Sequence, residues 1–309
     1  MTESTSPYTM VKSLELPTIS IVTPSYNQGH FLEDTILSVL GQGYPALEYI
    51  IMDGGSSDAS ADIIRKYEHH LSYWTSEKDK GQSDAINRGF ARATGEILLW
   101  LNSDDLLMPN VLKEMARLVR EGGDGIYFGN CIHFKGTEPG LESNGSDVVT
   151  AHRQFKLENC DYIIQPSSFW TKKVFETVGP LNESLHFGFD WEWFLRAKTK
   201  GIKMTALNDC FSMYRFHKDH KSGTGGRRRQ EELLSIYRTF NGDGAKLFGL
   251  LIEKDAHWNK REIYQAWLLK KYYRMMNKPL SEGHLLRTVK PGTYGKFKED
   301  EINSMLYML

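Results

Sequence analysis

Short apolar runs alternate with segments of helical period along residues 17–120 of the chain. Runs rich in β-branched and aromatic residues predict strands at Thr18–Pro24, Leu47–Gly55, Leu71–Glu77 and Glu96–Asn102. Segments with apolar residues three and four positions apart predict helices at His30–Gln42, after a cap at Ser57 or Asp58, at Ser83–Thr94 and at Pro109–Val119. Strands and helices that alternate with short links predict an α/β fold, with a mostly parallel central sheet flanked by helices.

The second half of the chain has a less regular pattern. Strands are predicted at Gly125–Phe134 and Met204–His217, and an amphipathic helix at Phe189–Gly201. The run QPSSFW leads into a helix that begins near Lys172. Residues 135–148 are rich in Gly, Ser, Asn and Glu, which predicts a mobile loop. From Arg227 onward the pattern is helical and predicts a helical C-terminal extension.

Polar side chains follow several of the predicted parallel strands. Thr23, Pro24 and Tyr26 come at or after the end of the first strand, Asp53 ends the second, and Asn102–Asp105 end a later one. The carboxyl ends of parallel strands meet at one edge of a sheet, and ligands bind in the crevice beyond that edge. We therefore expect these side chains to gather at one binding site.

Two acidic motifs at these strand ends each allow two interpretations. Asp104 and Asp105, in LLWLNSDD, can cap the helix that starts near Pro109, or their oxygens can hold Mg²⁺ or Mn²⁺. Asp53, in DGGSSD, can belong to a simple turn, or it can accept a hydrogen bond from a base or a ribose. No GxGxxG follows the first strand and no GxxxxGK[ST] occurs, which excludes a dinucleotide fingerprint and a Walker-type phosphate loop.

Three further clusters carry titratable groups. Asp84 can orient Arg88 or Asn87, within one helical turn, or it can form a plain surface salt bridge. Asp190 lies among aromatic residues in FDWEWFLR, where desolvation raises a carboxyl pKa and suits a general base, unless the acid points outward from an aromatic core. His217 and Lys221, in YRFHKDHKSG, belong to a basic cluster that can meet a pyrophosphate or be solvated.

Composition narrows the class of protein. The chain has 309 residues, 40% of them hydrophobic, which is enough for one large domain or two unequal ones. The formal net charge of −1 offers no basic excess for nucleic acid. Cys131, Cys160 and Cys210 are far apart, with no CxxC, which indicates free thiols in a reducing compartment. With no signal-peptide pattern and no apolar run near the ~20 residues that span a bilayer, we expect a cytoplasmic protein.

The order of these motifs resembles that of the family 2 glycosyltransferases, which have the Rossmann-like GT-A fold. The motifs that carry the resemblance are ISIVTPSYNQ, YIIMDGGSSDAS, KGQSDAINRGFARATGE, WLNSDD, QPSSFW, SLHFGFDWEWFLRA and YRFHKDHKSG. The resemblance implies a GT-A domain at residues 17–225, with a nucleotide-binding half at 17–120 and an acceptor-binding half at 121–225. Residues 1–16 are then a flexible N-terminus, and residues 226–309 a helical C-terminal extension.

The resemblance implies an inverting transfer from a nucleotide sugar, by family habit a UDP-sugar, that depends on Mn²⁺ or Mg²⁺. The acceptor would be a hydroxyl of a glycan or a lipid-linked glycan, in polysaccharide or cell-surface glycan biosynthesis. Nucleotide-binding roles fall on Thr23, Pro24, Tyr26, Asp53, Asp84, Arg88, Asn102 and Ser103. Metal binding falls on Asp104 and His217, and diphosphate binding on Arg215 and Lys221. The catalytic base falls on Asp190, and sugar contacts on Gln165, Ser168, His186, Trp191 and Trp193.

Two positions depart from the family pattern. Asn102 stands where the DxD motif begins with Asp, and an amide can hydrogen-bond a ribose hydroxyl but brings no charge to a metal. His220 stands where many relatives have Ser in an HxxSKT-like run, so the closing loop can be arranged differently. The first departure leaves open a catalytically inactive nucleotide- or sugar-binding module. A sugar nucleotidyltransferase would need a GxGxRLxPxT-like loop, which TPSYNQGHFLE is not.

Residues 258–278, WNKREIYQAWLLKKYYRMMNK, combine basic and aromatic residues at helical spacing. This pattern suits a helix that lies on the inner face of a membrane, which a lipid-linked acceptor would make useful. It equally suits a helix that packs back onto the catalytic domain or that forms a homodimer. The sequence leaves these three alternatives open.

Overall fold

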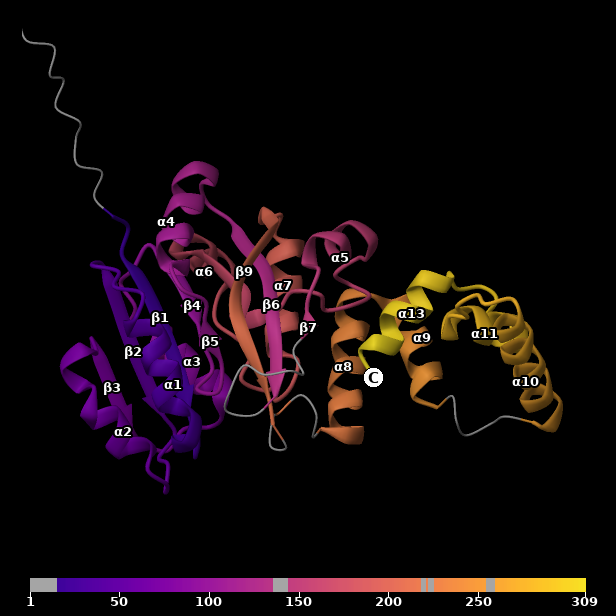
Figure 1. Ribbon diagram of the computed structural model, residues 1–309, viewed down its shortest axis with the longest axis horizontal. Coiled ribbons are helices and arrows are strands. Elements are labelled where there is room, and N and C mark those ends of the chain that lie inside the picture. Colours follow the sequence, from indigo (N-terminus) through magenta and orange to yellow (C-terminus); the bar gives the residue numbers. More distant parts are fainter. Residues whose placement is uncertain (1–15, 136–143, 218–220, 222–224, 254–258) are drawn as a thin grey trace, which may run out of the picture.

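The structure is a computed structural model that describes residues 16–135, 144–217, 221, 225–253 and 259–309 (Figure 1). The predicted flexible N-terminus, residues 1–16, lies outside the described residues except for its last position. Most of the predicted mobile loop at 135–148 and the departure at His220 also lie outside them.

One mixed sheet runs through the described residues, in the order β3-β2-β1-β4-β8-β6-β9-β5, with β7 paired to β6. Its strands are β1 Ile19–Ser25, β2 Leu47–Asp53, β3 Tyr73–Ser76, β4 Ile97–Trp100, β5 Leu106–Leu107, β6 Ile126–Lys135, β7 Asn144–Gly145, β8 Ser168–Thr171 and β9 Met204–Phe216. Strands β3, β2, β1 and β4 are parallel, whereas β8 is antiparallel to both of its neighbours. The predicted α/β fold is confirmed, and the all-parallel part of the sheet is its N-terminal half.

Helices cover both faces of the central sheet. They are α1 Gly29–Leu40, α2 Ser60–Lys66, α3 Gln82–Phe90, α4 Val111–Gly122, α5 Val148–Gln154, α6 Lys172–Val178 and α7 Phe189–Thr199. Successive side chains of β1 point to opposite faces. Val22 belongs to one buried cluster with Ile86 of α3, and Ile21 belongs to the other with Leu32 of α1. This double burial explains why β1 reads as a continuous apolar run rather than an alternating one.

Helix α7 is buried on two sides, so the prediction of an amphipathic helix there is wrong. Trp193 packs against Trp170 of β8, with ring centroids 4.7 Å apart. Trp191 packs the other way, against Tyr237 of the C-terminal helix α8 (Gly226–Phe240), with centroids 4.8 Å apart. The helix therefore lies between the sheet and the C-terminal helices, and its aromatic residues belong to the core.

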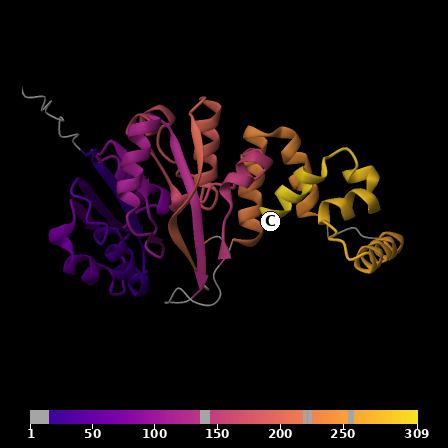
Figure 2. The ribbon, with the colours of Figure 1, turned by 45° about the horizontal axis from the view of Figure 1, so that its top comes forward.

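The helical C-terminal region is confirmed. It comprises α8 Gly226–Phe240, α9 Gly242–Ile252, α10 Lys260–Met275, α11 Glu282–Val289, α12 Pro291–Tyr294 and α13 Glu299–Tyr307. Phe248, Leu286 and Ile302 belong to the same buried cluster as Trp170 of the sheet. Figures 1 and 2 both show these helices on one side of the sheet, with α13 returning toward α8 and α10 at the far end. No helix among the described residues is long and apolar enough to cross a bilayer.

Candidate active site

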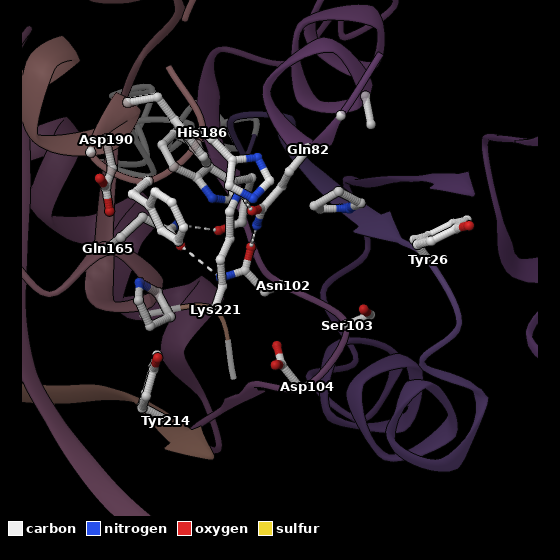
Figure 3. Close-up of a pocket in the computed structure, with 18 of the residues that line it drawn as sticks. Tyr26, Gln82, Asn102, Ser103, Asp104, Gln165, His186, Asp190, Tyr214 and Lys221 are labelled. Atoms are coloured by element: carbon white, nitrogen blue, oxygen red, sulfur yellow. Dashed lines mark hydrogen bonds between the residues drawn. The ribbon is translucent and has the colours of Figure 1, made fainter. Parts of the chain in front are cut away.

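A cavity of about 810 Å³ opens beyond the carboxyl ends of β1, β2 and β4 (Figure 3). The wall that residues 17–120 contribute consists of Pro24, Ser25, Tyr26, Gln28, Gly54, Gly55, Lys78, Asp79, Gly81, Gln82, Ala85, Trp100, Asn102, Ser103 and Asp104. The second half of the chain and the C-terminal helices build the opposite wall. Of the strand-end side chains expected to gather at one site, Pro24, Tyr26, Asn102, Ser103 and Asp104 do so.

Two predicted nucleotide-binding residues lie beneath the cavity surface rather than on it. Thr23 is fully buried, and its hydroxyl lies 3.1 Å from the Tyr49 hydroxyl. Asp53 is also buried, and it accepts hydrogen bonds from the Ser56 amide at 2.9 Å and from the Ser76 hydroxyl at 2.6 Å. Asp53 thereby fixes the turn after β2, whose next residue, Gly54, does line the cavity. Neither Thr23 nor Asp53 is among the lining residues of the cavity.

The turn after β2 approaches a neighbouring loop closely at Gly54, so a larger residue there would require the Asp79 carboxylate to move. A Cβ added at Gly54 would lie 2.5 Å from Asp79 Oδ2, well inside van der Waals contact. Gly54 and Asp79 both line the cavity, next to the exposed ring of Tyr26. Figure 3 shows the ring of Tyr26 on the opposite side of the cavity from Asp190.

The expected pairing of Asp84 with Arg88 is wrong. Asp84, in the first turn of α3, accepts a hydrogen bond from the Lys80 amide at 3.1 Å. Arg88 instead lies 3.4 Å from a carboxylate oxygen of Glu77, and neither Asp84 nor Arg88 lines the cavity. Asp84 acts on the loop that precedes α3, and that loop lines the cavity through Lys78, Asp79 and Gly81.

Asn102 is the centre of an amide network that an aspartate could not make. Its Oδ1 accepts from Gln82 Nε2 at 2.8 Å, and its Nδ2 donates to Gln165 Oε1 at 3.2 Å and to Asp105 Oδ2 at 3.3 Å (Figure 3). Gln165 Nε2 in turn donates to the Trp100 carbonyl at 2.8 Å. A carboxylate accepts but does not donate. The departure from the DxD pattern therefore has a structural reason, because the amide joins the two halves of the site.

Asp104, which lines the cavity, and His217, which is not among the lining residues, offer two metal-ligating atoms side by side. Asp104 Oδ2 lies 2.9 Å from His217 Nε2. Adjacent ligands of an octahedral cation, each at about 2.1 Å, are about 3 Å apart, so this pair fits two neighbouring positions of Mg²⁺ or Mn²⁺. No cluster of three His, Cys, Asp or Glu side chains suited to a metal exists within the part of the chain that the structure describes. A cation held by this pair would need further oxygen ligands from a substrate.

Asp105 and Arg215 lie behind Asp104, and neither lines the cavity. Asp105 is buried, its Oδ1 accepts from the Arg215 amide at 3.2 Å, and burial together with the charge of Asp104 raises its pKa. It does not cap α4, which begins after Asn110. The Arg215 guanidinium is also buried, donates to the Asp104 carbonyl at 3.1 Å, and pairs with Asp34 at 3.1 Å. The expected contact of Arg215 with a diphosphate is therefore corrected: it positions the main chain of Asp104.

Lys221, the other residue predicted to bind a diphosphate, does line the cavity. Its Nζ donates to Gln82 Oε1 at 2.8 Å and lies 5.0 Å from the centre of the Phe189 ring (Figure 3). Burial lowers the pKa of Lys221 to about 8, although Asp190 and Glu232 act in the opposite direction. An anionic group in the cavity would restore the charge of this ammonium, because an opposite charge nearby favours the ionised form.

Asp190 begins α7 at the far wall of the cavity. Its Oδ1 accepts a hydrogen bond from the Trp191 amide at 2.9 Å. Burial raises the pKa of Asp190, while Lys221 and Arg229 lower it. Asp161 lines the same cavity, and its pKa is raised well above the usual value by burial and by the charge of Asp190. Two carboxyl groups therefore share this wall, whereas the motif pattern indicates only one.

The predicted sugar-contacting residues divide into two groups. Gln165, His186 and Trp191 line the cavity, although the Trp191 Nε1 is engaged by the Leu157 carbonyl at 2.8 Å. Ser168 is fully buried and donates to the Gln165 carbonyl at 2.7 Å. Trp193 is also fully buried, with its Nε1 donating to the Gly179 carbonyl. Sugar contact by Ser168 or Trp193 is therefore corrected to support of the surrounding core.

The C-terminal helices contribute a wall that no sequence motif indicates. Arg229 and Leu233 of α8 line the cavity together with Tyr307 and Met308 at the end of α13. Arg229 Nη1 donates to the Met308 carbonyl at 2.8 Å, so α8 and α13 are joined at the cavity. These residues come from a helical region outside the resemblance, which is why motif comparison alone could not find them.

A central sheet with an acid at a parallel strand tip, facing a half-buried carboxylate across one large cavity, is the arrangement expected of a GT-A glycosyltransferase. The chain belongs to glycosyltransferase family 2, because the model described as Glycosyl transferase family 2 matches residues 20–223.

Named relatives agree with this assignment. The chain is 41% identical over 188 residues to an uncharacterized glycosyltransferase, MT1564, of Mycobacterium tuberculosis, covering 59% of this chain and 69% of that protein. It is 25% identical over 288 residues to the GalNAc(5)-diNAcBac-PP-undecaprenol beta-1,3-glucosyltransferase of Campylobacter jejuni, covering 86% and 89%. The match to the Bacillus subtilis protein TuaG spans 43% of that protein.

Solved structures share the fold at low sequence identity. Staphylococcus aureus TarS 1-349 in complex with UDP-GlcNAc superposes with a TM-score of 0.59 at 15% identity, over 89% of this chain and 82% of that chain. Mannosyltransferase PcManGT from Pyrobaculum calidifontis, in complex with GDP-Man and Mn²⁺, has a TM-score of 0.58 at 15% identity, over 94% and 85%.

Proposed function

We propose that this enzyme moves a sugar, with inversion, from a UDP-sugar to a hydroxyl of a glycan or lipid-linked glycan, with Mn²⁺ or Mg²⁺ as the cofactor. The observation that carries the proposal is the placement of Asp104 and Asp190 on opposite walls of one cavity (Figure 3). The first is a strand-tip acid paired with an imidazole, and the second is a half-buried acid in the first turn of α7.

The nucleotide would occupy the wall built by the parallel strands. The exposed ring of Tyr26 offers a face for a base, and the turn at Gly54 and Gly55 leaves room beside it. Asp53 and Thr23 would act through this turn and through β1, since both are buried beneath the surface. Asn102 and Ser103 stand at the strand tip, where a ribose hydroxyl would lie; Figure 3 shows Ser103 on the Tyr26 side of Asp104 and Asn102 beside Lys221.

Asp104 and His217 would hold the divalent cation. The cation, when bound, neutralises the charge that develops on the leaving diphosphate. The Lys221 ammonium would add a second positive charge from the other side of the cavity. Arg215 would keep the Asp104 main chain fixed, so that its carboxylate need not reorganise during the reaction.

Asp190 would remove the proton from the attacking acceptor hydroxyl. Burial raises its pKa, which strengthens the carboxylate as a base, and the nearby charges of Lys221 and Arg229 keep it from being neutralised altogether. The acceptor oxygen would then attack the anomeric carbon from the face opposite the diphosphate, which inverts its configuration. Asp161, whose pKa is raised by burial and by the charge of Asp190, lines the same cavity and would donate a hydrogen bond to the acceptor when protonated.

The acceptor would enter between α7 and the C-terminal helices. His186, Trp191, Leu233 and Tyr307 combine apolar faces with polar edges at that wall, which suits the C–H surfaces and hydroxyls of a sugar. The Campylobacter relative acts on an undecaprenol-linked glycan, as its name states, which supports a lipid-linked acceptor.

A donor screen tests this proposal. The full chain would be incubated with UDP-glucose, UDP-GlcNAc, UDP-galactose and GDP-mannose, with Mn²⁺, with Mg²⁺ and with EDTA, and nucleotide release would be measured. We expect release from a UDP-sugar that EDTA abolishes. Release that is indifferent to EDTA, or confined to GDP-mannose, would contradict the proposed cofactor or the proposed nucleotide.

A further inference from the structure

Helix α10, residues Lys260–Met275, touches the rest of the protein along one narrow stripe. Ala266 is its buried residue, and it packs with Leu285 and Val289 of α11. The Tyr273 hydroxyl lies 3.2 Å from His284 Nε2, and Glu262 pairs with Lys290 at 3.4 Å on the same side. The remaining faces of α10 point to solvent.

The solvent side of α10 and the residue after it is unusually apolar. Of the eleven large hydrophobic side chains that are exposed among the described residues, seven lie between residues 263 and 276. They are Ile263, Tyr264, Trp267, Leu268, Tyr272, Met275 and Met276, exposed by 42–73%. Scattered single apolar residues are ordinary on a protein surface, but a contiguous group marks an interaction site. We call this group the α10 face.

The exposed charged side chains on the segment of the α10 face are all positive. Residues 260–278 contain six basic residues, Lys260, Arg261, Lys270, Lys271, Arg274 and Lys278. Their one acid, Glu262, is turned inward, where it caps the helix start at the Asn259 amide and meets Lys290. The Lys271 ammonium lies 5.1 Å from the centre of the Trp267 ring, so base and aromatic ring share one face.

We propose that the α10 face docks this enzyme on an anionic lipid surface. Trp, Tyr, Lys and Arg are the side chains that suit the boundary between headgroups and acyl chains, because each has an apolar body and a polar end. A protein–protein interface core is depleted of lysine, whereas Lys271 here lies among the apolar residues. At a lipid surface, the same lysine extends its stem along the apolar residues and places its ammonium among phosphates.

The position of α10 agrees with such docking. It lies at the end of the molecule remote from the nucleotide-binding strands, so a surface bound there leaves the nucleotide side open to solvent (Figures 1 and 2). The inference extends the proposed function, since a lipid-linked acceptor would be presented at that surface, but docking does not depend on which sugar is moved.

Vesicle flotation tests the proposal with the full chain. The vesicles would be phosphatidylcholine alone and phosphatidylcholine with about one third phosphatidylglycerol. We expect flotation with the anionic vesicles and loss of it at high salt, because each base near the surface adds about fivefold to partitioning. The double variant Tyr264→Ser, Trp267→Ser and the triple variant Lys270→Gln, Lys271→Gln, Arg274→Gln should each reduce flotation at least tenfold.

Matched variants and a second readout distinguish lipid docking from misfolding and from dimer formation. Leu37→Ser removes an exposed apolar residue on α1 and should float like the parent. Circular dichroism confirms that each variant is folded, and UDP release without vesicles should stay within twofold, because α10 lies outside the cavity lining. Flotation with neither vesicle type overturns the inference, as does a dimer in sedimentation that the Trp267→Ser variant dissociates.

Discussion

Donor affinity should fall as the pH rises through 8, because of Lys221. Burial lowers the pKa of this ammonium from 10.5 to about 8, so in the folded enzyme the charge is present below pH 8 and is lost above it. A bound diphosphate favours the charged form and raises the pKa again. Binding of a nucleoside diphosphate near pH 8 should therefore take up a fraction of a proton.

The size of the effect follows from the titration. With a pKa of about 8, roughly nine tenths of the ammonium is charged at pH 7 and roughly one tenth at pH 9. If the diphosphate requires the charged form, the affinity falls about tenfold between these two pH values, which is about 1.4 kcal/mol. The phosphate groups of UDP do not add to this change, because their last proton has a pKa near 6.

Isothermal titration calorimetry of UDP with excess Mg²⁺, from pH 7 to pH 9 in two buffers of different ionisation enthalpy, measures both affinity and proton uptake. Lys221→Met should bind UDP weakly at every pH and lose the pH dependence. Lys173→Met, an exposed lysine that pairs with Asp124 away from the cavity, should behave like the parent. A UDP affinity that stays constant from pH 7 to pH 9 would show that the charge of Lys221 does not hold the diphosphate. The same conclusion would follow if the affinity of Lys221→Met changed with pH as the parent's does.

Three further variants test other parts of the site. Asn102→Asp should lower the free energy of unfolding by about 1–3 kcal/mol in urea, because it removes the donations to Gln165 and Asp105; an unchanged midpoint would contradict this. Asp104→Asn should weaken Mn²⁺ binding in the presence of UDP at least tenfold, and equal affinity by calorimetry would exclude it as a ligand. Trp193→Ala should lower the free energy of unfolding by about 3–5 kcal/mol, as expected for a core residue. A variant with unchanged stability and lower activity would instead support contact of Trp193 with the sugar.

Local sequence patterns predicted those strands and helices that depend on interactions between residues near one another in the chain. The strand Ile97–Trp100 and the helix Val111–Gly122 follow from apolar period and from the proline before the helix. The direction of Ser168–Thr171 could not be predicted, because a short apolar strand has the same pattern whether its neighbours are parallel or antiparallel. The burial of Phe189–Thr199 on two sides also depends on which elements pack against it, not on its own sequence.

The site was predictable in part for the same reason. Motif position placed Asp104 and Asp190 at the cavity, since each follows or begins an element whose end is fixed by the fold. Motif position misjudged Arg215, because a charge next to a site can point into the cavity or behind it, and only tertiary contacts decide. Asp161 and Arg229 were missed because no local pattern links two residues that are far apart in the chain and meet only at the cavity.

In the proposed function, Asp190 is the base that deprotonates the acceptor, and the donor binds without it. Asp190→Asn keeps the size of the side chain and removes its basicity, so the measurement compares transfer to acceptor with UDP-sugar affinity in the same preparation. We predict that kcat falls by about 10²–10⁴-fold, while the donor Kd stays within twofold of the parent. Retained transfer, or donor binding lost together with transfer, would contradict the assignment of Asp190 and with it the proposed division of the cavity.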